Sequence, residues 1–458
     1  MHSFTPANRE YPGGSNLSTD GLTGLRILMV SRGVVPIRTG CGGSELAAYQ
    51  LARYCAERGH DVALVADTGE EAALSTDGLE LVPIESRLQR LATRLPGNFF
   101  AWLLQHLVGN VTAALAARRL LRERQFDLIH AHGSLGAILI SFFSKLPLVY
   151  TEQDAPPWQC RYRSWWERRI RAVVYRTLNV TAFRRAQHVA ATFESLRREI
   201  VDRWGVAENA TSMIPNGANG GSNRIGKCDC GFDRYCLFVG RLTSRKGPDF
   251  VVHALAEAED DVCCVFAGDG PMRGEIEQLA TSLGVRDRIA FLGRVDPEDL
   301  APLYANAELL VLPSVSEASP LVVAEAMACG TPVLATRIAG LPNLVQDWET
   351  GFLVEPNNVG QLAVALRFLM RDSTLRRSMS KKARRRVGEQ FCWSHVGRQY
   401  EAAYGRLVSF LPPPPRVQPQ VESRRLRPKR VTPRRFDRQL LDHRPAIDPH
   451  RVAGRERV

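Results

Sequence analysis

Residues 308–332 read ELLVLPSVSEASPLVVAEAMACGTP, and this stretch decides the fold class. It opens with a short apolar run, which is typical of a buried parallel strand. Ser319 suits the N-cap of a following helix and Pro320 its first position, while Gly330 and Pro332 stop that helix after about ten residues. A buried strand followed by a helix of this length is one unit of an α/β sheet.

The same alternation of short apolar runs and helical patterns fills two series along the chain. In the first series, strands are expected at residues 25–30, 62–66, 127–131, 147–151 and 188–192, with a helix capped by Ser44 and ended by Gly59 after the first of them. In the second series, strands are expected at residues 235–240, 262–267, 289–292, 308–313, 332–336 and 351–354. The sequence therefore predicts an α/β protein with two doubly wound parallel sheets that face a cleft, where ligands bind at the carboxyl ends of the strands.

Composition predicts the segment boundaries. The N-terminus is polar and lacks the apolar core of a signal peptide, and a Gly-, Asn- and Cys-rich stretch between the two series suits a linker. Six segments are expected: a disordered segment 1–23, a first domain 24–216, a linker 217–233, a second domain 234–392, a terminal helix 393–411 and a disordered Pro-rich tail 412–458.

Charge is concentrated at the C-terminus. Residues 411–458 hold 12 arginines and one lysine against five acids, which is +8 of the net charge of +12. The basic balance therefore belongs to a tail, and no nucleic acid is expected as a partner. The ten cysteines are irregularly spaced, which favours a reduced, cytoplasmic protein. Cys228, Cys230 and Cys236 lack a second pair or a histidine at zinc-site spacing, so no metal site is predicted there.

Two stretches have a composition that is found in membrane-spanning or membrane-bound segments. Residues 95–117 carry no charge, but Asn98, Gln105 and Asn110 favour a buried or half-buried helix over one that spans a bilayer. Residues 161–176, RYRSWWERRIRAVVYR, place six arginines among two tryptophans and two tyrosines.

The second stretch leaves two interpretations open. It is either a helix at an anionic membrane surface or an Arg-rich helix whose rings pack on the first-domain core. The first interpretation predicts a peripheral protein at the inner face of the cell membrane. It also predicts salt-sensitive binding to anionic vesicles that weakens when residues 412–458 are deleted.

The helix after Ser319 begins just past a strand end, so its free N–H groups and positive pole suit a diphosphate in the cleft. Glu317 lies just ahead of this helix and Glu325 between one and two turns inside it, where carboxylates accept hydrogen bonds from hydroxyl groups. After another strand, residues 240–247 read GRLTSRKG.

Arg241 and Lys246 bracket that turn, and two cations there neutralise a leaving diphosphate that otherwise needs a divalent metal. The alternative for this segment alone is a solvated basic turn. The chain has no Asp-x-Asp pair, so a carboxylate-held metal is not expected.

The first domain offers weaker signals. Residues 40–44, GCGGS, follow a strand and let the backbone approach a ligand, but they lack the full dinucleotide fingerprint and the P-loop lysine. His130 and His132 end a strand and point to the same side, with His132 nearer the strand tip. A lone histidine at a strand end is more often a packing residue than a catalytic one.

Together these blocks resemble glycosyltransferase family 4, the retaining transferases of GT-B fold that use nucleotide-sugar donors. The likeness covers about residues 24–410 and rests on GGSELAAYQLARYCAERGHDVALV, DLIHAHG, IPNGAN, VGRLTSRKG, FAGDGPMRGEIEQLA, FLGRV and the pair Glu317 and Glu325. The resemblance implies a sugar transferase that usually needs no metal, with a terminal helix that crosses back to the first domain.

The resemblance also implies roles for single residues. Glu325 matches the glutamate on the donor ribose, Glu317 the one on the donor sugar hydroxyls, and Arg241 and Lys246 the pair on the diphosphate. The other matches are the helix amides near Ser319, Pro320 and Leu321 on the phosphates, Gly42 and Gly43 near the diphosphate and acceptor, His132 near the reacting sugar, and Gly293 and Arg294 beside the base.

Two departures from the family pattern concern the acceptor side and the linker. Ala218 and Asn219 stand where a Val-Asp pair is common, and Thr151, Glu152 and Gln153 where a Thr-x-His is common. The donor residues are intact, so activity is expected.

The expected reaction moves a hexose from a UDP- or GDP-linked donor to a saccharide or lipid-linked acceptor, for polysaccharide, glycolipid or cell-envelope synthesis, with no separate cofactor. The alternatives are a catalytically silent GT-B scaffold at the membrane and a nucleotide-sugar epimerase. An assay over a panel of nucleotide sugars separates the three.

Overall fold

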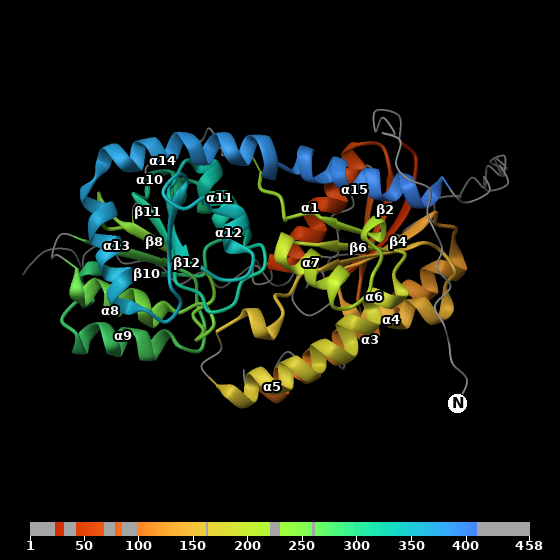
Figure 1. The fold of residues 1–458 in the computed structure, drawn as a ribbon, viewed down its shortest axis with the longest axis horizontal. Coiled ribbons are helices and arrows are strands. Elements are labelled where there is room, and N and C mark those ends of the chain that lie inside the picture. The colour runs from red at the N-terminus through yellow and green to blue at the C-terminus, as the bar shows by residue number, and fades with distance from the viewer. Residues whose placement is uncertain are drawn as a thin grey trace, which may run out of the picture. The chain divides into compact units, whose positions relative to one another are not determined.

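Two β-sheets with helices packed against them form the protein (Figure 1). The computed structural model describes residues 23–31, 43–67, 78–84, 99–161, 164–219, 230–258, 262–297 and 299–409, without the side chains of residues 99–103. The segment predicted to be disordered at the N-terminus, up to residue 22, and the predicted basic tail lie outside these ranges. The described strand pairs are parallel, as predicted for a doubly wound α/β fold.

The first sheet has seven strands in the order β3-β2-β1-β4-β5-β6-β7. Its strands are β1 (Arg26–Val30), β2 (Asp61–Ala66), β3 (Leu79–Pro83), β4 (Leu128–Ala131), β5 (Leu148–Glu152), β6 (His188–Ala191) and β7 (Thr211–Met213). Its helices are α1 (Gly43–Glu57), α3 (Phe99–Glu123), α4 (Ser134–Phe143), α5 (Trp165–Val174), α6 (Val180–Arg185) and α7 (Glu194–Asp202), with short turns η2 (Pro157–Gln159), η3 (Tyr175–Asn179) and η4 (Glu208–Ala210).

The second sheet has six strands in the order β10-β9-β8-β11-β12-β13. Its strands are β8 (Cys236–Val239), β9 (Cys264–Ala267), β10 (Ile289–Gly293), β11 (Leu309–Leu312), β12 (Val333–Thr336) and β13 (Gly351–Val354). Its helices are α8 (Pro248–Glu257), α9 (Arg273–Ser282), α10 (Leu300–Asn306), α11 (Leu321–Cys329), α12 (Leu341–Leu344), α13 (Val359–Arg371) and α14 (Ser373–Arg386), with η5 (Arg286–Arg288) and η6 (Val387–Phe391). The last helix, α15 (Trp393–Val408), packs on the first sheet.

The strands predicted from apolar runs are all present, and their ends shift by at most two residues. Two strands were not predicted, β3 and β7. Both are edge strands. The three residues of β7, TSM, are too few for a pattern, and β3 alternates buried and exposed positions at its start. Edge strands bury one side less completely, so they lack the continuous apolar run that marks a central parallel strand.

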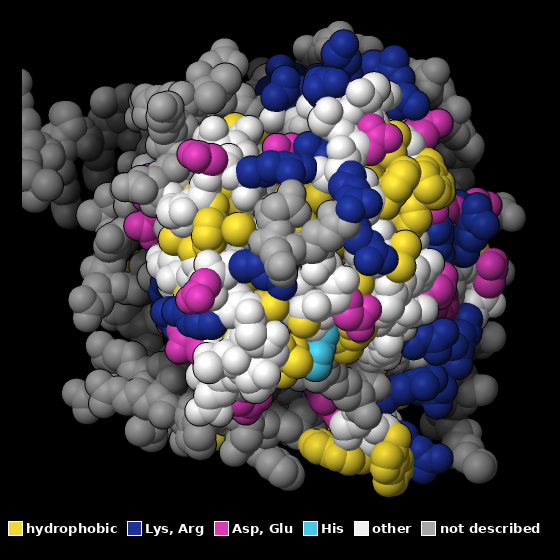
Figure 2. Space-filling view, turned by 90° about the vertical axis from the view of Figure 1, so that its left-hand side faces the viewer, with side chains coloured by type: hydrophobic (Ala, Val, Ile, Leu, Met, Phe, Trp, Pro, Cys, Tyr) yellow, Lys and Arg dark blue, Asp and Glu magenta, His cyan; other side chains and the backbone are white. Residues whose placement is uncertain are grey.

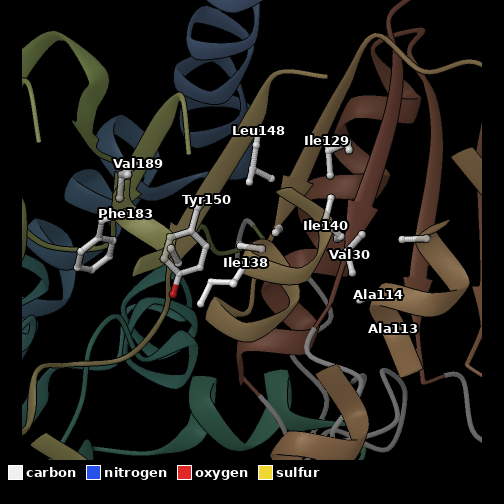
Figure 3. Packing of buried hydrophobic residues seen from close by; sticks show 14 of the residues in the cluster. Val30, Ala113, Ala114, Ile129, Ile138, Ile140, Leu148, Tyr150, Phe183 and Val189 are labelled. Carbon is white, nitrogen blue, oxygen red and sulfur yellow. The ribbon is translucent and has the colours of Figure 1, made fainter. Parts of the chain in front are cut away.

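Alternating residues of each central strand feed two cores on opposite faces of the first sheet. Leu28 and Val30 pack with one group of helices, and Ile27 and Met29 pack with the other. Figure 3 shows the first core, where Ile138 and Ile140 of α4 lie against the strands. The opposite core is formed with α1 and α15. Near-continuous burial on both faces is the reason that these strands read as apolar runs.

Helix α1 ends as predicted, because Gly59 adopts a φ of +86° and the amide of His60 donates to the Cys55 carbonyl. The prediction that Ser44 caps this helix is wrong. The helix already includes Gly43, and the Ser44 hydroxyl donates to Glu45 Oε2 at 2.8 Å.

The uncharged stretch predicted to be a helix corresponds to α3 from Phe99 onward, and residues 95–98 lie outside the described ranges. Within α3, Ala113 and Ala117 are buried while Leu107 and Leu115 are exposed, so the helix is half-buried as expected. No helix among the described residues has both the length and the apolar character to cross a membrane.

Helix α15 is held to the first sheet by a buried carboxylate. Glu401 is fully buried and accepts hydrogen bonds from Tyr54 Oη at 3.2 Å and Arg58 Nε at 3.2 Å, while His60 Nε2 lies 3.3 Å from its Oε1. His60 Nδ1 in turn accepts from the amide of Leu25. Burial raises the pKa of Glu401, but the hydrogen bonds from His60 and Arg58 outweigh burial and hold that pKa below its ordinary value.

Replacing Glu401 with Ala removes the acceptor that three side chains share. We expect the free energy of unfolding at neutral pH to fall by about 2 to 3 kcal/mol, because buried donors lose their partner. The pKa of Glu401 is lowered by folding, so its contribution is present at neutral pH and disappears as the pH falls through the lowered pKa. Urea denaturation at neutral and acidic pH measures both effects.

Glu57→Ala is the matched control. Glu57 forms an exposed pair with Arg53 one helical turn away, at 2.9 Å, and its loss should change stability by less than about 0.5 kcal/mol. Equal losses for Glu401→Ala and Glu57→Ala would contradict the anchoring role of Glu401.

Candidate active site

The candidate site lies where the strand order of the second sheet reverses. The chain runs outward from β8 to β10 and then returns to β11, which pairs with β8 on its other side. In open parallel sheets, ligands bind beyond the carboxyl ends of the strands at such a switch point. The turn after β8, residues 240–247, and the loop after β11, residues 313–320, begin at this point.

These two loops are joined by an ion pair. Lys246 Nζ lies 2.5 Å from Glu317 Oε1, and the Ser314 hydroxyl donates to the same oxygen at 2.8 Å. The side chains of Lys246 and Glu317 are only 18% and 8% exposed, so water screens this pair less than it would a surface pair. The amide of Val315 donates to the Arg245 carbonyl and adds a backbone link between the loops.

Arg241 begins the turn that carries Lys246. Its side chain is exposed, and its carbonyl accepts from the amide of Thr243. The turn therefore presents one solvent-facing cation and one partly shielded cation at the carboxyl end of β8.

Two glycines let the loops approach this closely. Gly247 has a φ of +68°, and a Cβ there would lie 2.5 Å from the Pro313 carbonyl oxygen. Gly268, at the end of β9, has a φ of +156°, and its Cβ would lie 1.9 Å from the Gly240 carbonyl oxygen. Any larger residue would push the Lys246 turn away from its neighbours.

Helix α11 begins differently from the prediction. Pro320 is the N-cap and Leu321 the first helical residue, so the assignment of Ser319 to the N-cap is wrong. The Ser319 hydroxyl instead accepts a hydrogen bond from the amide of Asn216 at 3.0 Å. The predicted stop is confirmed, because Gly330 adopts a φ of +81° after the last turn.

Glu325 lies in α11 with a partner that sequence reasoning missed. Tyr304 of α10 donates its hydroxyl to Glu325 Oε2 at 3.0 Å. Burial raises the pKa of Glu325, and the Tyr304 hydrogen bond opposes that rise. Tyr304 itself is buried, and burial raises its pKa well above the ordinary value. No sequence pattern marked Tyr304, because α10 and α11 meet only in the folded chain.

Gly293 and Arg294 lie at the end of β10, the edge strand of the second sheet. The Gly293 carbonyl accepts from the amide of Gly268 at 2.7 Å, and the amide of Gly240 donates to the Ala267 carbonyl at 3.1 Å. These bonds connect the loops after β8, β9 and β10. The Arg294 side chain is exposed beyond them.

His132 follows β4 in the first sheet and is buried. Its ring lies next to that of His130, with 4.2 Å between centroids and 31° between the ring planes, so the two histidines share one side as alternation predicted. His130 lies 2.7 Å from both the Tyr404 hydroxyl and the Thr151 hydroxyl. Burial lowers the pKa of His130 well below its ordinary value, and His132 lowers it further. His130 is therefore a neutral link between the strand ends and α15.

Glu152 occupies one of the positions that departs from the family pattern, and the structure buries it completely. Its oxygens accept from the Tyr150 hydroxyl at 3.0 Å, from the amide of Asp154 at 2.8 Å and from the Asn179 side chain. Asn179 comes from the π-helical turn η3, which continues directly from α5. Glu152 therefore anchors the start of the loop after β5.

That loop reaches the Ser314–Ser319 region of the second half. Cys160 Sγ donates to the Ser316 hydroxyl at 3.2 Å, and the Arg161 amide donates to the Val315 carbonyl at 2.8 Å. Asn216 provides a second link, because its side-chain amide donates to the Gln153 side chain at 3.2 Å and to the Ser319 carbonyl at 2.9 Å. Asn216 belongs to the quoted IPNGAN block, but no role was predicted for it.

The structure thus brings together Lys246, Glu317 and Ser319 in directly linked loops, with Arg241 on the same turn as Lys246. Glu325, Pro320 and Leu321 belong to the helix that continues this loop. His132 lies at a carboxyl strand end of the first sheet. Gly43 is the first described residue of α1, and Gly42 lies outside the described residues.

Two parallel sheets of this topology, each with its switch point at the carboxyl strand ends, are the architecture of the GT-B fold. Two family models match the chain: Glycosyltransferase Family 4 over residues 41–219 and Glycosyl transferases group 1 over residues 232–386. The chain belongs to glycosyltransferase family 4.

Curated relatives agree with this assignment. A D-inositol 3-phosphate glycosyltransferase of Corynebacterium diphtheriae is 28% identical over 417 residues, which are 83% of this chain and 94% of that protein. An N-acetyl-alpha-D-glucosaminyl L-malate synthase of Bacillus anthracis is 39% identical over 174 residues, but these span only 38% of this chain and 45% of that protein. The chain spans 59% of an uncharacterized glycosyltransferase of Methanocaldococcus jannaschii, to which it is 30% identical.

Solved structures share the fold. Sucrose-phosphate synthase from Thermosynechococcus elongatus superposes with a TM-score of 0.70 at 24% identity, over 84% of this chain and 98% of that one. The Anabaena protein HepE, solved in complex with UDP-glucose, gives a TM-score of 0.59 at 21% identity, over 84% of this chain and all of that one.

Replacing Asn216 with Ala removes the side-chain link between Gln153 and Ser319. We expect the free energy of unfolding to fall by about 1 to 2 kcal/mol, because two buried or part-buried acceptors lose a donor. Asn219→Ala, at an exposed position of the same segment, is the control and should stay within about 0.5 kcal/mol of the wild type. Urea denaturation measures both, and an unchanged stability of Asn216→Ala would contradict the bridging role.

Proposed function

We propose that this glycosyltransferase moves a hexose from a UDP- or GDP-linked donor to an acceptor hydroxyl with retention of configuration and without a metal. The observation that carries the proposal is the Lys246–Glu317 pair at the switch point of the second sheet, together with Glu325 on the adjoining helix. Lys246 then supplies a cation for the diphosphate, Glu317 a carboxylate for the sugar hydroxyls and Glu325 a carboxylate for the ribose hydroxyls.

The comparisons support a nucleotide-sugar donor. HepE was solved with UDP-glucose, and the names of the other relatives describe transfer of sugars or synthesis of sugar derivatives. The acceptors in these names differ from one another, so they support the class of reaction rather than one acceptor. We propose a saccharide or lipid-linked acceptor, used in polysaccharide, glycolipid or cell-envelope synthesis.

The proposed chemistry needs charge stabilisation more than covalent catalysis. As the bond between the sugar C1 and the diphosphate oxygen breaks, negative charge grows on the leaving nucleoside diphosphate. Arg241, Lys246 and the positive N-terminal end of α11 at Leu321 stabilise this charge. With the donor bound, the diphosphate replaces Glu317 as the main partner of Lys246, and Glu317 accepts hydrogen bonds from the donor sugar.

The acceptor oxygen forms its bond to C1 on the face that the diphosphate leaves, and its proton passes to the departing diphosphate oxygen. His132, held against His130, orients the sugar from the first sheet. Glu325 accepts hydrogen bonds from the ribose hydroxyls, with Tyr304 fixing one of its oxygens. We assign Gly42 and Gly43 to the diphosphate and Gly293 and Arg294 to the base, the roles that the family resemblance implies for them.

Metal independence follows in this proposal from the two cations and from the absence of an Asp-x-Asp pair in the sequence. No separate cofactor is required, because the donor carries its own activating group.

A thermal-shift screen over a panel of nucleotide sugars, followed by a transfer assay, tests the proposal. A donor at about a hundred times its Kd stabilises the fold by about 2.7 kcal/mol. Stabilisation without transfer or hydrolysis would favour the silent scaffold, and conversion of the donor to its epimer would favour an epimerase. No stabilisation by any donor would overturn the proposed site.

Glu325→Ala should leave the protein folded and lower kcat/KM for the donor by about 10- to 100-fold. The ribose hydroxyls lose a charged acceptor, which is worth about 1.5 to 3 kcal/mol. Initial rates at limiting donor measure the effect. Glu275→Ala, an exposed glutamate on α9, is the control and should leave the rate unchanged. Near-normal activity of Glu325→Ala would remove Glu325 from the donor site.

Replacing Arg241 and Lys246 together with Ala should lower kcat by about 10³-fold, because the leaving diphosphate loses both side-chain cations. Arg245→Ala changes an exposed arginine of the same turn and should leave kcat within about twofold of the wild type. Turnover and thermal unfolding measured on both variants separate a chemical defect from a folding defect. A double variant that keeps wild-type turnover and donor affinity would disprove the metal-free leaving-group model.

A further inference from the structure

Helix α5 (Trp165–Val174) has no buried residue along its length. Trp165 is 71% exposed, Val173 61%, Trp166 46% and Ile170 38%. At about 100° per residue, these four side chains fall on one arc of about 140°. A helix that turns an apolar arc away from the core, rather than toward it, needs an external partner for that arc.

One of the two interpretations drawn from the sequence is therefore wrong for both tryptophans, since neither ring packs on the core. That interpretation is confirmed for Tyr175, just beyond the helix, which is buried and packs edge-on against Trp158 with ring centroids 5.3 Å apart. Tyr162 lies outside the described residues. Tyr175 begins the turn η3, so it anchors one end of α5, while Trp165, Ile170 and Val173 of the helix stay exposed.

Arginines border and interrupt the apolar arc. Arg168 and Arg169 are exposed on α5, and Arg176 is exposed just after it. The guanidinium of Arg169 lies over the Trp165 ring, 5.5 Å from its centroid. The acidic residue of the helix, Glu167, is paired with Arg171.

Other helices of the same layer share this character. Leu104 and Leu107 of α3 are 44% and 49% exposed, and Phe142 of α4 is 66% exposed beneath the guanidinium of Arg185, 4.5 Å from the ring centroid. Helices α3, α4 and α6 pack on one face of the first sheet, and Figure 1 shows α5 extending from this group. Figure 2 shows hydrophobic side chains beside Lys or Arg at its lower edge, the height at which α5 lies in Figure 1.

The combination fits a lipid surface better than a second copy of this chain. In a symmetric dimer through α5, the same arginine-bearing face of both copies would meet, and the like charges of the two faces would oppose the contact. At a bilayer interface, tryptophan rings lie at the headgroup level and arginines bind anionic headgroups on either side of them.

We propose that the outer face of α5 docks on an anionic lipid surface and holds the donor loop above it. This inference rests on the proposed function, in that the loop is taken as the donor site. Only residues 162–164 separate Arg161, whose amide binds the Val315 carbonyl, from Trp165 on α5. The Ser316 hydroxyl is held by Cys160 just before that amide. The short connection places the Glu317 loop close to the lipid, where a lipid-borne acceptor presents its hydroxyl.

The test uses the full chain and two kinds of vesicle, phosphatidylcholine alone and phosphatidylcholine mixed with phosphatidylglycerol. Co-sedimentation at low and high salt measures binding. We expect binding to the mixed vesicles only, lost at high salt. Trp165→Ser combined with Trp166→Ser should weaken it by at least about tenfold. Trp348→Ser removes a tryptophan that is 55% exposed in the second half and serves as the matched control, with unchanged binding.

A spectroscopic measurement locates the contact independently. Brominated lipids in the mixed vesicles should quench tryptophan fluorescence of the wild type and of Trp348→Ser, and should quench the double variant much less. Equal binding to both vesicle types, no binding at low salt, or undiminished binding of the double variant would overturn the proposal. If the wild type dimerises, binds no vesicles and loses dimerisation in the double variant, the outer face of α5 is instead an interface with a second copy of the chain.

Failure of this inference is distinguishable from failure of the proposed function. Stabilisation by a nucleotide sugar, measured without lipid, should be the same for the wild type and for the double tryptophan variant. If that stabilisation is present but vesicle binding is absent, the lipid proposal falls and the donor site stands. If the protein binds vesicles but no donor stabilises it, the lipid proposal stands and the donor site falls.

Discussion

Parallel pairing of β8 with β11 is the constraint on which the candidate site depends. The chain completes β9 and β10 between these two strands, so their pairing brings together loops that are distant in sequence. Lys246 and Glu317 are 71 residues apart along the chain and share a hydrogen bond in the fold. Because every strand of the sheet points the same way, the loops after β8, β9, β10 and β11 all begin at one edge.

Polar contacts link the first half to this edge. Asn216 binds Gln153 and the Ser319 carbonyl, and Cys160 and the Arg161 amide bind the loop around Ser316. Such contacts are individually worth about 1 kcal/mol, so they orient the donor loop without locking it. The loop that makes two of them starts at the buried Glu152 and leads into α5. The buried Glu152 carboxylate therefore holds the start of this loop, and the exposed helix α5 follows its end.

Helix α15 provides the partners of several buried polar groups of the first half. Glu401 accepts hydrogen bonds from Tyr54 and Arg58 and lies within hydrogen-bond distance of His60. His130 lies between the hydroxyl groups of Tyr404 and Thr151. A half-satisfied network in a low-dielectric core is costly, so these contacts specify where α15 sits as well as stabilising it. The strand that bears His130 also carries His132 at its tip, and the position of the candidate catalytic histidine thus depends on a helix from the far end of the chain.

Sequence patterns were enough to predict the fold class, because parallel strands buried on both faces are short apolar runs. They also marked Arg241, Lys246, Glu317 and Glu325 by their positions at strand ends and in the helix that follows. They did not reveal the edge strands β3 and β7, whose residues are only partly buried, or the true N-cap of α11. The hydrogen bonds of Ser319 with Asn216 and of Tyr304 with Glu325, and the exposure of the tryptophans of α5, became visible only in the folded chain. Each of these depends on contacts between residues distant in sequence, and local periodicity carries no information about which distant residue supplies the partner.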